Sequence, residues 1–262
     1  MHDFNPELEI LYNVHFLEEW FLKHSDDRGH AKAVIGISGG KDSTVAAALL
    51  VKAIGNANVI GVMMPNGEQS DIDDAKRVCG RVLNIPHMTI NIENVYKAEL
   101  KVLADSDIVR PTDQLITNLP PRIRMMTLYA VAQSLDVPAF VVNTCNRSED
   151  YVGYSTKYGD AAGDIAVLQD YLVSEVIAMG DELDLPEELV HKTPSDGLCG
   201  KTDEDNLGFS YVDLDSYLIS KDKIEAGIFP ECTINGELVK IIEKRHIANL
   251  HKLKRIPSLY NR

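Results

Sequence analysis

A short stretch rich in glycine and charged side chains is the part of the sequence best suited to chemistry. It consists of Gly36, Ile37, Ser38, Gly39, Gly40, Lys41, Asp42 and Ser43. Adjacent glycines allow a sharp backbone turn and bring N–H groups close to a bound anion. Lys41 adds a positive charge, whereas Asp42 would repel phosphate unless a divalent cation lay between them. The stretch therefore predicts a loop that binds phosphate together with a metal ion.

This loop is expected to join a buried strand to a helix. The apolar run 33–37 precedes it and a helical run, 43–54, follows. The positive end of that helix would point at the bound anion. The loop differs from the common nucleoside-triphosphate loop, because Lys41 is followed by Asp42 rather than by serine or threonine.

Strand and helix signals alternate along the chain. Strands are predicted at 33–37, 59–64, 88–92 and 139–143, and helices at 6–23, 43–54, 70–83, 95–103, 122–135, 211–219 and 237–250. Ser70 with Asp73 resembles a capping box, and Pro120-Pro121 is expected just before a helix. This order predicts one α/β domain over residues 1–262, with a parallel, doubly wound, Rossmann-like sheet in a three-layer sandwich.

Ligands in such sheets bind beyond the carboxyl ends of the strands, so the loops after Ile37, Met64 and Asn143 should share one cleft. The third of these loops, residues 143–164, is long, polar and rich in glycine. A solvated surface loop is one interpretation. Its place after a buried strand favours a functional loop, and makes Glu149 a candidate ligand rather than an ordinary surface carboxylate.

Composition limits the possible partners and compartment. A net charge of −14 argues against broad nucleic-acid binding. No apolar run approaches the length of a membrane span, and the first residues do not resemble a signal peptide. Four widely separated cysteines indicate reduced thiols in a cytoplasmic protein, without a zinc site. The basic C-terminal segment from Lys240 is either a solvated helix face or an anion-binding arm.

The first loop resembles the SGG-x-DS loop of the N-type ATP pyrophosphatases, enzymes that cleave ATP to AMP and pyrophosphate while adenylating a substrate. Thr144, Glu149, the block 153–160 and Asp164 together resemble the NAD synthetase pattern within that superfamily. The resemblance implies amidation of deamido-NAD to NAD with ammonia and ATP, through an acyl-adenylate, as the last step of NAD biosynthesis. It also implies a homodimer.

The resemblance implies roles for individual residues. Asp42 and Glu149 match magnesium ligands, and Lys41, Asp42 and, in ammonia handling, Asp160 are the catalytic candidates. The ATP-binding positions are Gly36, Ile37, Ser38, Gly39, Gly40, Lys41, Asp42, Ser43, Thr144 and Ser195. The deamido-NAD positions are Arg122, Lys157, Asp164, His251 and Lys252, and the last two favour the anion-binding arm.

Two alternatives stay open. Val173 stands where the family often has an ATP-contacting lysine, which lends some support to a regulatory module that holds ATP without turnover. The second alternative is a different adenylating enzyme of the superfamily, for instance one that acts on tRNA. No cysteine fits a nucleophile elbow, so ammonia, either free or delivered by a separate glutaminase, is the expected nitrogen donor. Residues 192–206 are expected to cover the bound substrate.

Overall fold

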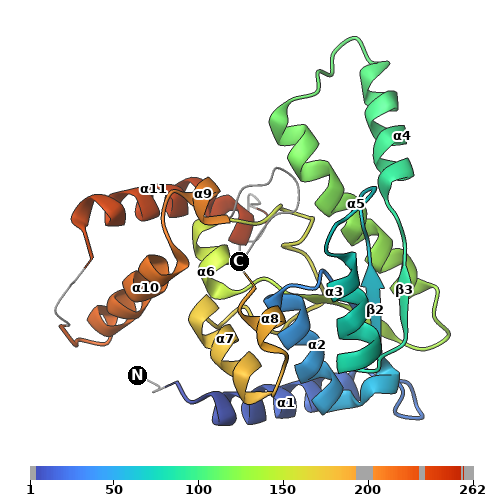
Figure 1. The fold of residues 1–262 in the computed structure, drawn as a ribbon, viewed down its shortest axis with the longest axis horizontal. Helices are drawn as coiled ribbons and strands as arrows, with labels where there is room; N and C mark the ends of the chain where they lie inside the picture. The colour runs from blue at the N-terminus through green and yellow to red at the C-terminus, as the bar shows by residue number, and fades with distance from the viewer. Residues whose placement is uncertain (1–3, 193–202, 230–233, 255, 257–262) are drawn as a thin grey trace.

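The computed structural model describes residues 4–192, 203–229, 234–254 and 256 (Figure 1). Its sheet has five parallel strands in the order β3-β2-β1-β4-β5. The strands are β1 (Lys32–Gly36), β2 (Val59–Met63), β3 (His87–Thr89), β4 (Ala139–Asn143) and β5 (Ile165–Ala166). The doubly wound parallel sheet predicted from the sequence is confirmed, whereas β5, only two residues long, was not predicted.

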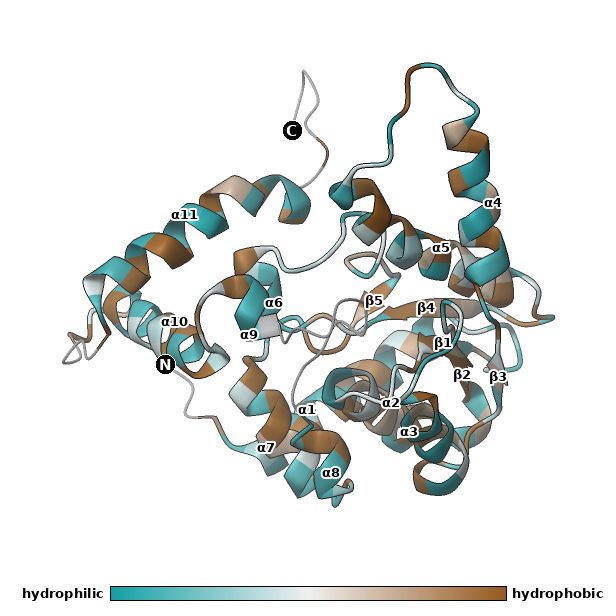
Figure 2. Cartoon of the chain, turned by 45° about the horizontal axis from the view of Figure 1, so that its top comes forward, coloured by the Kyte–Doolittle hydropathy of each residue, from teal (hydrophilic) through white to brown (hydrophobic). Residues whose placement is uncertain are grey.

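Helices cover both faces of the sheet (Figure 2). Ala33 and Ile35 of β1 pack into the larger apolar cluster with α1 (Pro6–Lys23), α2 (Lys41–Ile54), α7 (Val173–Glu182) and α8 (Glu187–Val190). Val34 points to the opposite face, where α5 (Asp113–Gln133) packs. Successive side chains of a strand face opposite sides, so a strand covered on both faces must be apolar at every position. That requirement explains why β1 was recognisable as a continuous apolar run.

The helix α5 differs from the prediction. Pro120 and Pro121 lie inside it rather than before it, and the helix begins at Asp113. Each proline removes an N–H donor and normally ends a helix. Here the Thr112 side chain caps the first turn by accepting from the Leu115 N–H, and Ile123 is buried against the sheet. Tertiary packing and the cap together outweigh the local cost of the prolines.

The boundaries of other elements also differ from the predictions. The capping box predicted at Ser70 and Asp73 is wrong, because α3 (Ile72–Arg77) begins after Asp71 without a side-chain cap and continues as the π-helical turn η2 (Val78–Val82). The segment 143–164 is not loop throughout, because it contains the short helix α6 (Arg147–Val152), and β5 follows it directly. The remaining elements before α5 are η1 (Asn56–Asn58) and α4 (Glu93–Ala104).

The C-terminal helices form a separate layer beside the sheet. Their two long members, α10 and α11, lie next to each other in both views (Figure 1 and Figure 2). They are α9 (Asp203–Leu207), α10 (Tyr211–Glu225) and α11 (Gly236–Leu253). A third apolar cluster, which includes Val152, Val173, Leu214 and Ile242, joins α10 and α11 to α6 and α7. The predicted caps Asn5 and Ser210 are confirmed, because each side chain accepts a helical N–H. In the described part of the chain, no helix combines the length and apolar character of a membrane crossing.

Candidate active site

The glycine loop lies between β1 and α2, as predicted, although α2 begins at Lys41, two residues earlier than expected. Gly39 has a φ of +84°, and a Cβ there would lie 2.7 Å from the backbone nitrogen of Ala75. The loop therefore needs glycine both for its backbone conformation and for its close approach to α3. The Ser38 N–H donates to Ser43 Oγ over 3.3 Å, and the Gly40 N–H donates to Ser38 Oγ over 3.2 Å. These bonds fix the turn.

Lys41 is a buried cation at the first position of α2, with only 4% of its surface exposed. Its Nζ donates to Asp42 Oδ2 over 2.9 Å and lies 5.8 Å from the centre of the Tyr211 ring. A charge this deeply buried must be compensated by other groups. The Asp42 carboxylate and the face of the tyrosine ring both compensate it, so the ammonium is held beside the loop in a defined position.

Asp42 and Glu149, the two predicted metal ligands, contact the same residue, Asn146. Asn146 Nδ2 donates to Asp42 Oδ1 over 3.0 Å. Asn146 Oδ1 accepts the Glu149 N–H over 3.0 Å, and the Asn146 N–H lies 3.5 Å from Glu149 Oε2. The last two contacts form a capping box at the start of α6. The structure thus brings together two carboxylates that are far apart in the sequence.

Further carboxylates surround this place. Burial raises the pKa of the Cys145 thiol, and the charges of Glu149, Asp160, Asp150 and Asp42 raise it further. Burial, reinforced by Asp160, raises the pKa of Asp150 to about 6. Burial also raises the pKa of Asp160, against the opposing effect of the Thr156 N–H that donates to it. Negative charge is therefore concentrated beside the glycine loop, which favours a bound cation.

The donor set fits magnesium. Among the described residues no three His, Cys, Asp or Glu side chains form a complete metal cage. Magnesium in phosphate-transferring sites is commonly held by one or two carboxylates together with substrate phosphates and water. Asp42 and Glu149, next to the loop predicted to bind phosphate, provide such an incomplete, oxygen-only set.

Four of the five residues predicted to bind the second substrate meet at one place. Arg122 Nε on α5 donates to the Lys157 carbonyl over 3.3 Å, and Lys157 Nζ donates to the His251 carbonyl over 2.7 Å. Lys252 Nζ, at the end of α11, donates to the carbonyls of Gly153 and Ser155 over 2.6 and 2.9 Å. These contacts tie α5, the loop 153–160 and the basic end of α11 together.

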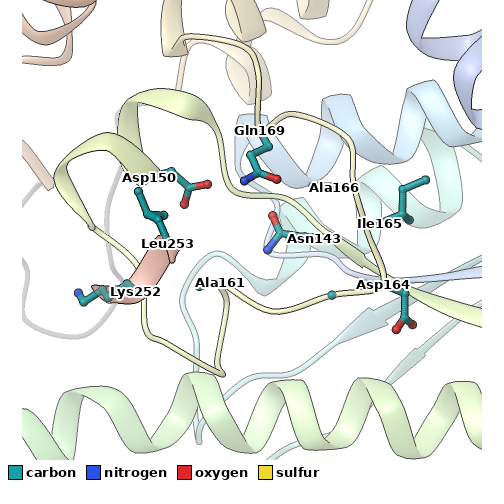
Figure 3. Close-up of a pocket in the computed structure, with 10 residues that line it drawn as sticks. Asn143, Asp150, Ala161, Asp164, Ile165, Ala166, Gln169, Lys252 and Leu253 are labelled. Carbon is teal, nitrogen blue, oxygen red and sulfur yellow. The ribbon is translucent and has the colours of Figure 1, made fainter. Parts of the chain in front are cut away.

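Asp164 is placed differently. Its carboxylate accepts from the Tyr129 hydroxyl over 3.1 Å and from the Val141 N–H over 2.8 Å, so it pins the loop to β4. A cavity of about 270 Å³ is lined by Asp164, Asp150, Gln169 and Lys252, among others. In Figure 3 the side chains of Asp150 and Gln169 point into the same space, whereas that of Asp164 points away from it.

The sequence did not single out Arg124, Asn146 or Asp150. Arg124 Nε donates to the carbonyl of Met64, at the end of β2, over 3.0 Å. Burial lowers the pKa of its guanidinium, and the nearby Asp160 opposes that shift. Arg124 is partly buried, whereas Arg122, the predicted residue, is exposed. In the sequence, these three residues could have been recognised as site residues only from their positions, either after a strand or on the inner side of a helix.

The remaining predicted positions have mixed outcomes. Thr144 follows the last residue of β4 directly, at the carboxyl edge of the sheet. Val173 is buried at the first position of α7, within the third apolar cluster that also contains Tyr211. Ser195, and residues 193–202 of the expected covering segment, lie outside the described residues. Cys79 and Cys145 are free and buried.

Comparison with known proteins gives one consistent result. The sequence profile of the NAD synthase family matches residues 13–256. The NH(3)-dependent NAD(+) synthetase of Thermococcus kodakarensis is 38% identical over 88% of this chain and 90% of its own length. Among solved structures, the NMN synthetase of Francisella tularensis superposes with a TM-score of 0.83 at 33% identity, covering 98% of this chain and 99% of the other. The NH3-dependent NAD synthetase of Campylobacter jejuni gives 0.76 at 26%, covering 98% and 100%.

Proposed function

The chain belongs to the NAD synthase family, and we propose that it amidates deamido-NAD to NAD with ammonia and ATP, releasing AMP and pyrophosphate. This is the last step of NAD biosynthesis, and the enzyme is a ligase that forms a C–N bond. The observation that carries the proposal is the pair of carboxylates, Asp42 and Glu149, held on one residue beside a glycine loop.

In the first half-reaction the substrate carboxylate attacks the α-phosphorus of ATP. Both reactants are anionic, so the barrier is largely electrostatic. The glycine loop at the start of α2 and the ammonium of Lys41 would bind the phosphates. Asp42 and Glu149 would hold Mg²⁺, which supplies positive charge to the phosphates and the leaving pyrophosphate. The product is an acyl-adenylate.

In the second half-reaction ammonia attacks the adenylated carbonyl and AMP leaves. Arg122, Lys157, His251 and Lys252 would bind the dinucleotide, and their convergence supports a single anion-binding surface there. Asp160 is a candidate for handling ammonia, because it is a buried carboxylate with a raised pKa near the other site carboxylates. Positioning supplies much of the rate, since no protein nucleophile is required.

A second candidate acceptor is the corresponding mononucleotide. The Francisella tularensis protein described as an NMN synthetase covers nearly the whole chain and superposes with a TM-score of 0.83. The chemistry at the nicotinate carboxyl would be the same for both acceptors, so the ATP site described above does not distinguish them. The difference would lie in how the far end of the substrate is bound.

The proposal extends to the assembly and the compartment. We take the chain as one NAD synthetase domain over residues 1–262, acting in the cytoplasm as a homodimer without nucleic-acid or membrane partners. Leu8, Leu11 and Phe16 form an exposed apolar stripe on α1, which suits a contact between two copies. Ammonia, free or delivered by a separate glutaminase, is the nitrogen donor.

The deciding experiment incubates the purified chain with ATP, Mg²⁺ and ammonium, and with either nicotinate adenine dinucleotide or nicotinate mononucleotide. We expect stoichiometric AMP and NAD from the dinucleotide, and far less product when glutamine replaces ammonium. Faster NMN formation from the mononucleotide would assign the second candidate. ADP as the nucleotide product would reject both. Formation of AMP only with a tRNA acceptor would favour the tRNA-acting alternative.

A further inference from the structure

Asn146 makes more contacts than the capping of a short helix requires. Its side chain is completely buried, at 0% exposure, between α2 and α6. The side-chain oxygen caps α6, which serine or aspartate could do equally well. The side-chain nitrogen donates instead to Asp42, which is 104 residues away in the sequence. Only an amide can make both bonds at once without adding negative charge to a site that already holds several carboxylates.

These contacts restrict both proposed metal ligands. Asp42 has one oxygen bonded by Lys41 and the other by Asn146, so its carboxylate is fixed in one orientation. Each oxygen keeps a further lone pair for a metal. Glu149 is the third residue of α6, and the capping box turns its side chain back toward the Asn146 backbone. Because α6 has only six residues, its orientation depends on that cap rather than on its own helix propensity.

We propose that Asn146 is a positioning residue that holds Asp42 and Glu149 at the separation required for one divalent cation. This inference rests on the proposed function for the identity of the site. Groups that orient metal ligands typically change metal affinity by about 10–100-fold when they are removed. A residue needed only to cap α6 would change stability and leave metal affinity unaltered.

Two substitutions separate the roles. Asn146→Ser keeps an oxygen that can cap α6, but its side chain is too short to reach Asp42. Asn146→Ala removes both contacts. The matched control is Asn5→Ser, because Asn5 caps α1 through the same kind of bond to Leu8 and touches neither carboxylate.

The primary readout is Mn²⁺ binding in the presence of a non-hydrolysable ATP analogue, followed by electron paramagnetic resonance, with thermal unfolding measured in parallel. For Asn146→Ser we expect binding weakened by about 10–100-fold with a melting temperature close to that of the wild type. Asn146→Ala should show the same weakening and a lower melting temperature, and Asn5→Ser should bind Mn²⁺ as the wild type does.

Wild-type Mn²⁺ affinity in Asn146→Ser would overturn the inference. Failure of the proposed function gives a different result: the wild type would form neither NAD nor NMN, whatever the Mn²⁺ binding of the variants. Because Mn²⁺ binding is measured without turnover, the role of Asn146 is decided independently of the reaction that the enzyme catalyses.

Discussion

Replacing Gly39 by alanine tests whether the glycine loop must lie against α3. Gly39 has a φ of +84°, and an added Cβ would lie 2.7 Å from the Ala75 nitrogen and 2.8 Å from the Asp74 Cβ. Gly29 provides a matched control, because it has a φ of +77° but open space around the same position. Both variants incur the cost of a left-handed alanine, whereas only Gly39→Ala also forces atoms apart.

The expected magnitudes follow from these two contributions. The left-handed backbone costs about 1–2 kcal/mol in the free energy of unfolding for either variant. Overpacking against rigid backbone adds about 1–3 kcal/mol for Gly39→Ala alone. In a chain of this size, each kcal/mol lowers the melting temperature by about 2–4 °C. The difference between the two variants should therefore be about 2–12 °C.

The assay combines thermal unfolding with ATP–pyrophosphate exchange. If the chain relieves the overlap by moving the glycine loop, the backbone N–H groups of the loop also move. The rate of ATP–pyrophosphate exchange in Gly39→Ala should then fall by at least about tenfold, equivalent to roughly 1.4 kcal/mol. Gly29→Ala should keep its exchange activity. Equal melting temperatures for the two variants, together with normal exchange in Gly39→Ala, would refute the reasoning.

Three further predictions concern the site and its supports. Asp42→Asn should abolish magnesium-dependent turnover with an unchanged circular dichroism spectrum, and full activity would contradict its metal role. Burial would raise the pKa of Glu243, but hydrogen bonds from Tyr151, Tyr217 and Lys221 outweigh it and lower the pKa to about 2. Ionised Glu243 therefore stabilises the folded state fully above pH 4.5, and this stabilisation is lost as the pH falls from 4.5 toward 2. The urea midpoints of the wild type and of Glu243→Gln should differ at pH 7 and converge at low pH. Lys252→Met leaves the Gly153 and Ser155 carbonyls without their donor, and should lower the unfolding free energy by about 1–3 kcal/mol and raise KM for the dinucleotide, unlike the exposed control Lys240→Met.

Local chemistry along the chain was sufficient to predict four of the five strands and the glycine loop. A strand buried on both faces must be a continuous apolar run, so β1, β2 and β4 were recognisable without knowledge of their neighbours. A helix start needs a side-chain acceptor within a few residues, which made the caps Asn5 and Ser210 visible. The metal role of Asp42 remains a prediction, but its motive, an acid inside a phosphate loop, lies entirely in neighbouring residues.

Only the tertiary structure could decide which distant residues meet. Asn146 was not distinguishable from a loop asparagine until the starts of α2 and α6 were placed close together, because its decisive bond reaches Asp42 in the first turn of α2. The two prolines of α5 are tolerated because a cap and buried side chains stabilise the helix around them, whereas local propensity alone predicts a break. The basic end of α11 was expected to be a solvated helix face or an anion-binding arm; only the tertiary structure shows Lys252 bonded to the carbonyls of the loop 153–160, and its anion-binding role stays a prediction. Local patterns predict elements that satisfy their own hydrogen bonds and burial, while contacts between elements depend on packing that no short segment encodes.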